Sequence, residues 1–185
     1  MWIAIQNAVG ARQGVGGGPG PTPPPYTPPL DAYPATAAYS VRRLRTDYSG
    51  APIEAYRVSD GATQDIQFDS QGLLDTTELT TFASGGEVRV RTWYDQMENG
   101  YDAVGVLDSE YPVIFDGTNV ILDGANPALR FNPTNNTGLQ ISPDITLSGN
   151  LLIVALATTD GSAGANTLTI FYANTNYTTV GPGGS

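Results

Sequence analysis

The sequence predicts a mainly β protein, an antiparallel sandwich with one or two short helices, preceded by an extended N-terminal arm. Two observations predict the sandwich. The apolar runs are short and rich in β-branched and aromatic residues, and Asp-Gly or Asn-Pro pairs separate them. A third observation predicts the arm, because seven of the 14 prolines stand between Pro19 and Pro29, just after a glycine cluster. Such a segment makes neither ladder nor helix hydrogen bonds.

The residue content argues against several classes of function. The 185 residues carry eight basic side chains, all arginine, against 18 acidic ones, so the net charge is -10. Nucleic-acid binding is therefore disfavoured, because an acidic chain has no basic face to replace phosphate counterions. There is no cysteine and no histidine, which removes thiolate and histidine metal ligands and the nucleophiles that depend on them. The lack of cysteine is typical of a chain made in a reducing cytoplasm.

Residues 1–13 form a short apolar segment that is too short for a membrane span or a signal peptide. Its apolar side chains are Trp2, Ile3, Ile5 and Val9. The segment is either a frayed terminus or an anchor that binds another protein, and we expect no membrane insertion. We favour the anchor because residues 14–34 form a Gly/Pro-rich linker, whose proline part should extend by about 3.1 Å per residue.

The folded domain is predicted to span residues 35–174, and it begins with a short helix at 35–44 that Thr36 could cap. Three arginines of this region would lie on the outer side of that helix, where we expect them to pair with local carboxylates. The arginines are Arg42, Arg43 and Arg45, and the candidate partners are Asp47, Glu54 and Asp60.

Two strands and a helix are predicted next, with the strands at residues 53–58 and 65–68. Asp75 with a glutamate three positions later, Glu78, is a capping-box pattern that marks the start of a helix. Leu79 and Phe82 would give this helix a short apolar face before the Ser-Gly-Gly sequence at 84–86 ends it.

The strongest strand signal is the two-faced alternation of residues 88–94. Asn99-Gly100 then supplies a tight turn, and a second apolar run begins at Ala103, so we expect a β-hairpin or corner. The later strands are predicted at 103–107, 111–115, 120–122, 128–131, 139–141, 151–157 and 167–172, before a flexible tail at 175–185. Either the C-terminal strands of the sheets are reduced or missing from this chain, or neighbouring subunits complete the sheets.

The sequence Thr92-Trp93-Tyr94-Asp95-Gln96, followed by Asn99-Gly100 and Asp102-Ala103, resembles a "WYDQSGNGxDA" signature of concanavalin-A-like (jelly-roll) sandwich domains. Two groups carry this signature: the catalytic domain of fungal α-L-arabinofuranosidase B and a set of phage tail and virion proteins. Further short motifs match in order, and the resemblance covers roughly residues 36 to 140. They begin at Tyr39, Tyr48, Tyr56, Asp65, Leu74, Phe82 and Pro127. Such a match is more specific for fold than for activity.

The resemblance implies a phage virion structural protein: a tail-fibre, tail-tip or head-decoration subunit, assembled in the host cytoplasm. Its expected partners are other virion proteins, bound through the N-terminal arm, further copies of the chain in a homo-oligomer, and a host-surface glycan. The alternative is an arabinofuranosidase-like glycoside hydrolase or a carbohydrate-binding module. Hydrolysis in that family uses two carboxylates, for which we find no matching positions, so we expect no enzyme activity.

The motif itself contains the candidate site residues. Trp93, Tyr94 and Tyr101 are either aromatic contacts for a glycan or structural aromatics. Asp95 is expected to cap the turn with backbone hydrogen bonds, although Asp95 and Asp102, with Glu98 and Asn99, could supply oxygens to calcium. We expect no other cofactor.

Overall fold

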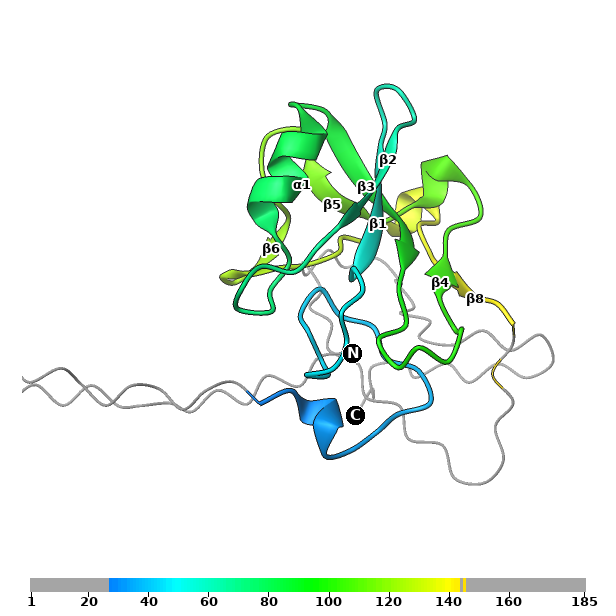
Figure 1. The fold of residues 1–185 in the computed structure, drawn as a ribbon. Helices are drawn as coiled ribbons and strands as arrows, with labels where there is room; N and C mark the ends of the chain where they lie inside the picture. The colour runs from blue at the N-terminus through cyan, green and yellow to red at the C-terminus, as the bar shows by residue number, and fades with distance from the viewer. Residues whose placement is uncertain (1–26, 144, 146–185) are drawn as a thin grey trace, which may run out of the picture.

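The computed structural model describes residues 27–143 and 145 (Figure 1). This part of the chain is mainly β and antiparallel with one short α-helix, which confirms the predicted class. The strands are β1 (Ile53–Arg57), β2 (Thr63–Ile66), β3 (Glu87–Trp93), β4 (Ala103–Val104), β5 (Val113–Asp116), β6 (Leu122–Asp123), β7 (Asn126–Pro127) and β8 (Gln140–Ile141). The helices are α1 (Thr76–Ala83) and the 3-10 turns η1 (Pro29–Asp31), η2 (Asp108–Glu110) and η3 (Pro133–Asn135).

Strand β3 lies at the centre of the main sheet. The strand order is β2-β1-β3-β4-β8, and β5 also pairs with β3, while β6 and β7 form a separate hairpin. Along β3 the partner changes from β5, opposite Glu87 to Arg89, to β4, opposite Thr92 and Trp93. The β3–β4 pairing is antiparallel, as the predicted hairpin requires. The segment that follows β3 is therefore fixed to the middle of the sheet.

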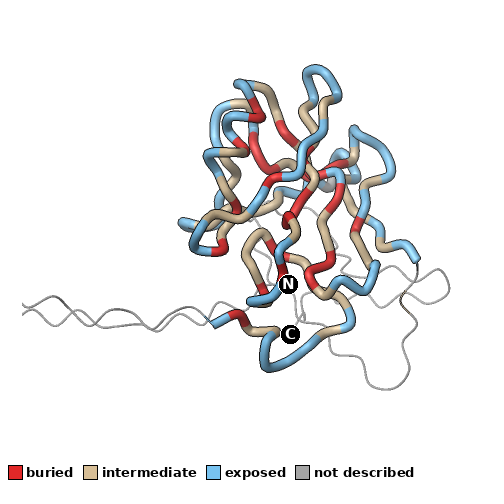
Figure 2. Tube along the Cα trace, viewed as in Figure 1, coloured by how far each residue is buried: buried red, intermediate tan, exposed pale blue. Residues whose placement is uncertain are grey.

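One face of the sheet and one face of α1 enclose the core. Val88 and Val90 of β3 are fully buried, whereas Arg89 is half-buried and Arg91 is exposed, so the predicted alternation is confirmed. Helix α1 contacts β1, β2 and β5. It packs Leu79 into the same cluster. Figure 2 shows buried stretches on the strands and the helix, and further ones in the loops next to them. Burial of this apolar surface is the main driving force for the fold.

Helix α1 begins where the capping pattern predicts, and it uses only half of that pattern. The Asp75 carboxylate accepts hydrogen bonds from the amides of Thr77 and Glu78, both at 2.9 Å. The Glu78 carboxylate turns to strand β2 instead of the cap, and accepts from Gln64 Nε2 at 2.9 Å and from the Gln67 amide at 2.7 Å. The helix ends in left-handed backbone at Ser84, with φ 49°.

The predicted helix at residues 35–44 is wrong. These residues form irregular structure, because side chains distant in sequence bind their backbone groups in place of helical hydrogen bonds. Several strands are also shorter than predicted. The strand at 103–107 ends at Val104, where Gly105 lies so close to the Tyr111 ring that a Cβ would come within 2.2 Å of it. Residues 128–131 form no strand: Arg130 makes an isolated bridge with Val113, and the Ala128 amide donates to the Ile121 carbonyl at 2.9 Å.

The described residues include the end of the linker, and it contacts the domain. The amide of Leu30 in η1 donates to the carbonyl of Leu44 at 3.0 Å. The anchor at 1–13, most of the linker, the predicted strands at 151–157 and 167–172 and the tail at 175–185 lie outside the described residues. Within the described part, no helix has the length and apolar character needed to cross a membrane.

Candidate functional site

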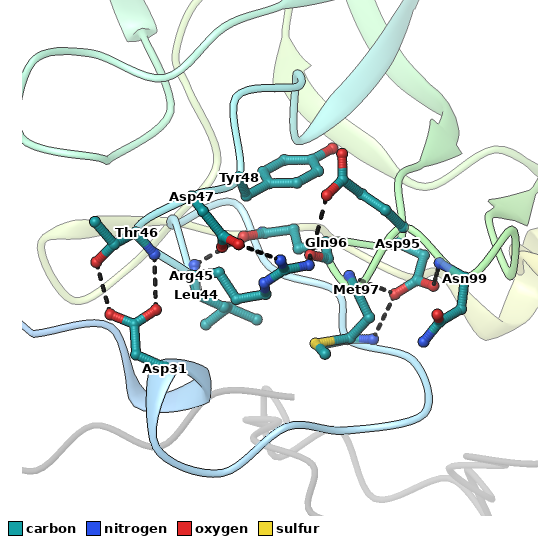
Figure 3. Close-up of polar contacts among 12 residues, drawn as sticks. Asp31, Leu44, Arg45, Thr46, Asp47, Tyr48, Asp95, Gln96, Met97 and Asn99 are labelled. Atoms are coloured by element: carbon teal, nitrogen blue, oxygen red, sulfur yellow. Dashed lines mark hydrogen bonds and ion pairs between the residues drawn. The ribbon is translucent and has the colours of Figure 1, made fainter.

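Gln96, the last residue of the motif, has a fully buried side chain that binds the segment at residues 38–44. Its Nε2 donates to the carbonyls of Ser40 at 2.8 Å and Arg42 at 2.9 Å. Its Oε1 accepts from the Leu44 amide at 2.7 Å, and its own amide donates to the Ala38 carbonyl at 2.9 Å. Figure 3 shows the Gln96 side chain and its hydrogen bond with the Leu44 amide. All three side-chain bonds are made inside the protein, where an unmade one would be costly.

The carboxylate of Asp95 organises the turn after β3, and the side chain is 3% exposed. Oδ1 accepts from the amides of Ala38 at 2.9 Å and Met97 at 3.0 Å, and Oδ2 accepts from the Asn99 amide at 3.2 Å. Asp102 caps the other side, because its Oδ1 accepts from the Asp95 amide at 2.8 Å. Both carboxylates thus bind backbone amides, and the described residues contain no cluster of three or more metal-binding side chains.

The turn itself requires two residues with positive φ. Glu98 has φ 58° and Gly100 has φ 78°. Asn99 lies between them, and its Nδ2 donates to the Thr36 carbonyl at 2.9 Å. The Asn-Gly pair therefore marks the turn, as predicted, and the asparagine also ties it to the start of the domain.

The three candidate glycan aromatics make separate contacts in the domain. Among the described aromatic rings, none of Trp93, Tyr94 and Tyr101 pairs with another of the three. Trp93 is half-buried against the core, and its ring centroid lies 5.9 Å from that of Tyr39. The indole Nε1 of Trp93 is buried and has no hydrogen-bond acceptor among the described residues. The Tyr101 carbonyl accepts a hydrogen bond from the Tyr39 hydroxyl.

Burial and nearby carboxylates perturb two tyrosines of this region. Burial raises the pKa of Tyr39 above its usual range, and the charges of Asp95 and Asp102 raise it further. Burial also raises the pKa of Tyr94, as does its hydroxyl's hydrogen bond to Asp65 Oδ1 at 2.8 Å. Both phenols remain neutral hydrogen-bond donors at neutral pH.

A second set of contacts ties the end of the linker to the same place. The Asp31 carboxylate accepts from the Thr46 amide at 2.8 Å and from the Thr46 hydroxyl at 2.6 Å. These hydrogen bonds lower the pKa of Asp31. Arg45 Nη1 donates to the Gln96 carbonyl at 3.1 Å, while Nη2 binds Asp47 at 2.6 Å. We call the bonds from Leu30 and Asp31 through residues 44–46 to Gln96 the linker clamp.

A cavity of about 530 Å³ opens beside the linker clamp. It is lined by Leu30, Asp31, Pro34, Arg45, Thr46, Asp47, Met97 and Asn99. Three separate segments of the chain contribute to it: the end of the linker, the loop at 45–47 and the turn after β3. Figure 3 shows several of these side chains together with their hydrogen bonds.

The expected arginine pairs are found in part. Arg45 pairs with Asp47 as predicted, and it also approaches Glu98, at 3.5 Å. The other two carboxylates pair elsewhere: Glu54 with Arg91 at 3.3 Å, and Asp60 with Arg57 at 2.7 Å. Arg43 instead lies over the Phe68 ring, 5.2 Å from its centroid. Arg57 lies on β1 and Arg91 on β3, and these positions place each guanidinium within ion-pair distance of its carboxylate.

Sequence reasoning did not identify Gln96 or Asp31 as organising residues. The one signal for Gln96 was its place in the motif, directly after a two-faced strand and an acidic residue. Asp31 stands among prolines at the end of the predicted linker, where no periodicity marks it. Their partners are 52 and 15 positions away, at Leu44 and Thr46 respectively, so no local pattern reveals them.

No family model and no curated protein matches this chain. Among solved structures, it is similar to a chain described as "GH54 a-l-arabinofuranosidase soaked with cyclic sulfate inhibitor", with a TM-score of 0.42 and 24% sequence identity. The similarity covers 62% of this chain and 25% of that chain. The chain is thus structurally similar to part of a GH54 α-L-arabinofuranosidase, and the similarity concerns the fold alone.

Proposed function

We propose that this chain is a structural protein of a phage virion, a tail-fibre, tail-tip or head-decoration subunit. Its N-terminal arm attaches to other virion proteins, and its β domain is displayed outward, where it adheres to a host-surface glycan. The observation that supports this proposal most is the linker clamp, which fastens the end of the arm to the turn that follows the central strand β3.

The clamp suits a domain that is held by its arm. A force applied to the arm enters the described structure near Pro28 and reaches the loop at 44–46 through the bonds of Leu30 and Asp31. From there, the bonds of Gln96 pass it to the end of β3. Because β3 pairs with β1, β4 and β5, the force is spread over the main sheet. A subunit that is attached to a particle through its arm needs a connection of this kind between the arm and its folded domain.

The chemistry of the arm supports attachment to a protein partner. The arm contains the apolar residues Trp2, Ile3, Ile5 and Val9, and a Gly/Pro-rich sequence stands between them and the domain in the chain. Several copies bound together would turn weak single contacts into stable attachment, and we include a homo-oligomer in the proposal.

Deletion of the arm tests this proposal. Residues 1–26 are removed so that the linker clamp stays intact, and particles are assembled with the shortened or the full chain. We expect both chains to have the same melting temperature and only the full chain to be found in purified particles by mass spectrometry. Trp2→Ala should cause a smaller loss of incorporation. If the shortened chain enters particles as well as the full chain, the arm is not the attachment, and if neither is a particle component, the proposal fails.

A further inference from the structure

We infer that the cavity beside the linker clamp is a binding site for a neutral saccharide. The inference deepens the proposed adhesion to a host glycan and rests on that function for its biological meaning. The cavity is an open depression of the surface, and its volume, about 530 Å³, lies within the range of small-ligand sites in proteins. The cavity is also a different place from the candidate glycan site of the motif, because its described lining does not include Trp93, Tyr94 or Tyr101.

The cavity offers both acceptors and donors to sugar hydroxyl groups. Asp47 uses Oδ2 for Arg45, which leaves Oδ1 to accept a hydroxyl proton. Each oxygen of Asp31 accepts one bond from Thr46 and retains a second lone pair. Arg45 supplies N–H donors, and the side-chain amide of Asn99, held through Nδ2, presents its oxygen as an acceptor. Adjacent sugar hydroxyls need such a mixture.

The remaining lining is apolar, and it suits the C–H face of a sugar ring. Leu30 and Pro34 come from the end of the linker, and Met97 comes from the turn after β3. The thioether of methionine adapts to irregular apolar shapes. A ring bound between these groups would exchange contact with water for van der Waals contact.

The charges around the cavity select against an acidic sugar. Among the described residues of the lining, Arg45 is the one cation, and it is already paired with Asp47 at 2.6 Å and lies 3.5 Å from Glu98. With Asp31 added, three carboxylates surround one guanidinium. A sugar carboxylate would meet net repulsion there, whereas neutral hydroxyls can donate to the carboxylates.

The polar groups are held in place before any ligand arrives. The Gln96 carbonyl orients Arg45, the Thr46 amide and hydroxyl orient Asp31, and the Thr36 carbonyl orients Asn99. A ligand therefore has to order few side chains, which reduces the entropic cost of binding.

The test is titration calorimetry on the full chain with glucose, galactose, mannose and N-acetylglucosamine, and with glucuronate as the anionic comparison. Asp47→Ala is the test variant and Asp60→Ala its matched control. Both carboxylates are exposed and bind an arginine, at 2.6 Å and 2.7 Å, and only Asp47 lines the cavity. Melting temperatures confirm that both variants fold.

We expect at least one neutral sugar to bind with a Kd of about 1 mM, and glucuronate to bind more weakly. Binding should weaken about tenfold in Asp47→Ala, through loss of a charge-assisted hydrogen bond, and stay unchanged in Asp60→Ala. The inference is overturned if no neutral sugar binds, if the two variants behave alike, or if glucuronate binds as tightly. Particle incorporation of Asp47→Ala separates this result from the proposed function, because that variant keeps the arm and should be incorporated normally.

Discussion

Gln96 forms, with a single side chain, the bonds that a helix would otherwise have made within residues 38–44. Its amide supplies two donors and one acceptor to backbone groups of Ser40, Arg42 and Leu44. A carboxylate in its place would lack the donors, and an apolar side chain would lack both. The residue identity therefore follows from the backbone groups that need partners.

Gln96→Leu should lower the free energy of unfolding by about 3 to 5 kcal/mol, because it leaves three backbone groups without partners in the interior. Gln64→Leu is the control: Gln64 is exposed and makes one side-chain hydrogen bond, to Glu78, so its loss should cost about 0.5 kcal/mol or less. Urea unfolding of the two variants and the unmodified chain measures both effects. An equal loss of unfolding free energy in the two variants would mean that the buried hydrogen bonds of Gln96 stabilise the fold no more than the exposed one of Gln64.

Asp60 predicts a pH effect at the residue scale. Hydrogen bonds from Arg57 and from the Ala62 amide lower the pKa of Asp60 from 3.8 to about 2. The folded state therefore binds a proton at Asp60 less readily than the unfolded state does. The stability that the ionised Asp60 contributes to the folded state is present above pH 3.8 and is lost as the pH falls towards 2. Asp60→Asn should lose less stability than the unmodified chain between pH 4 and pH 2, as followed by urea unfolding. Parallel curves would contradict this assignment.

At the scale of elements, the sequence predicts well those elements that local patterns determine. Strand β3 and helix α1 carry their own signals, alternation in one and a capping residue in the other, and both lie within a residue or two of the predicted bounds. The helix at 35–44 fails because Asp95 and Gln96, more than 50 positions away, bind its backbone. Strand β4 ends early, at Val104, and the next residue, Gly105, packs against Tyr111, a contact that only the folded chain shows.

The candidate site was predictable to a similar extent. The hairpin or corner predicted after the strand at 88–94 is present, and Asp95 accepts backbone hydrogen bonds, as predicted for a turn-capping residue. The cavity was not predictable, because Asp31, Asp47 and Met97 belong to three segments that no shared pattern connects. Such sites depend on tertiary contacts.

Helix α1 gives the prediction at this scale. Asp75→Ala removes the acceptor for the Thr77 and Glu78 amides and should cost about 1 kcal/mol of stability. Asp123→Ala, at an exposed position of β6, is the control and should change stability by less than about 0.5 kcal/mol. Thermal unfolding monitored by circular dichroism compares them. An Asp75→Ala melting temperature equal to that of the control would show that the cap is dispensable.

At the scale of the whole molecule, the structure combines a compact β domain with a clamped linker end. The carboxylates of the sheet already have structural partners: Glu54 binds Arg91 and Thr92, and Asp65 binds the Tyr94 hydroxyl. Glycoside hydrolysis requires two carboxylates that face a shared substrate, one of them able to donate a proton. We therefore propose a binding and structural role for the molecule.

This proposal predicts that the chain does not hydrolyse an aryl α-L-arabinofuranoside. The expected result is release of the aryl group at the rate of the buffer control, with a secreted arabinofuranosidase as the positive control. Hydrolysis that is abolished by Glu54→Gln or Asp65→Asn would contradict the proposal and assign the chain to the enzymes.

Amide hydrogen exchange at Leu30 and Leu44 tests the central claim, that Gln96 fastens the end of the arm to the sheet. The Leu44 amide donates to Gln96 Oε1, and the Leu30 amide donates to the Leu44 carbonyl. Both amides should be protected in the full chain and exchange much faster in Gln96→Leu, while the Val90 amide, bonded to the Pro112 carbonyl, keeps its protection relative to global unfolding. Unchanged protection of Leu30 and Leu44 in the variant would show that the arm is held by other contacts.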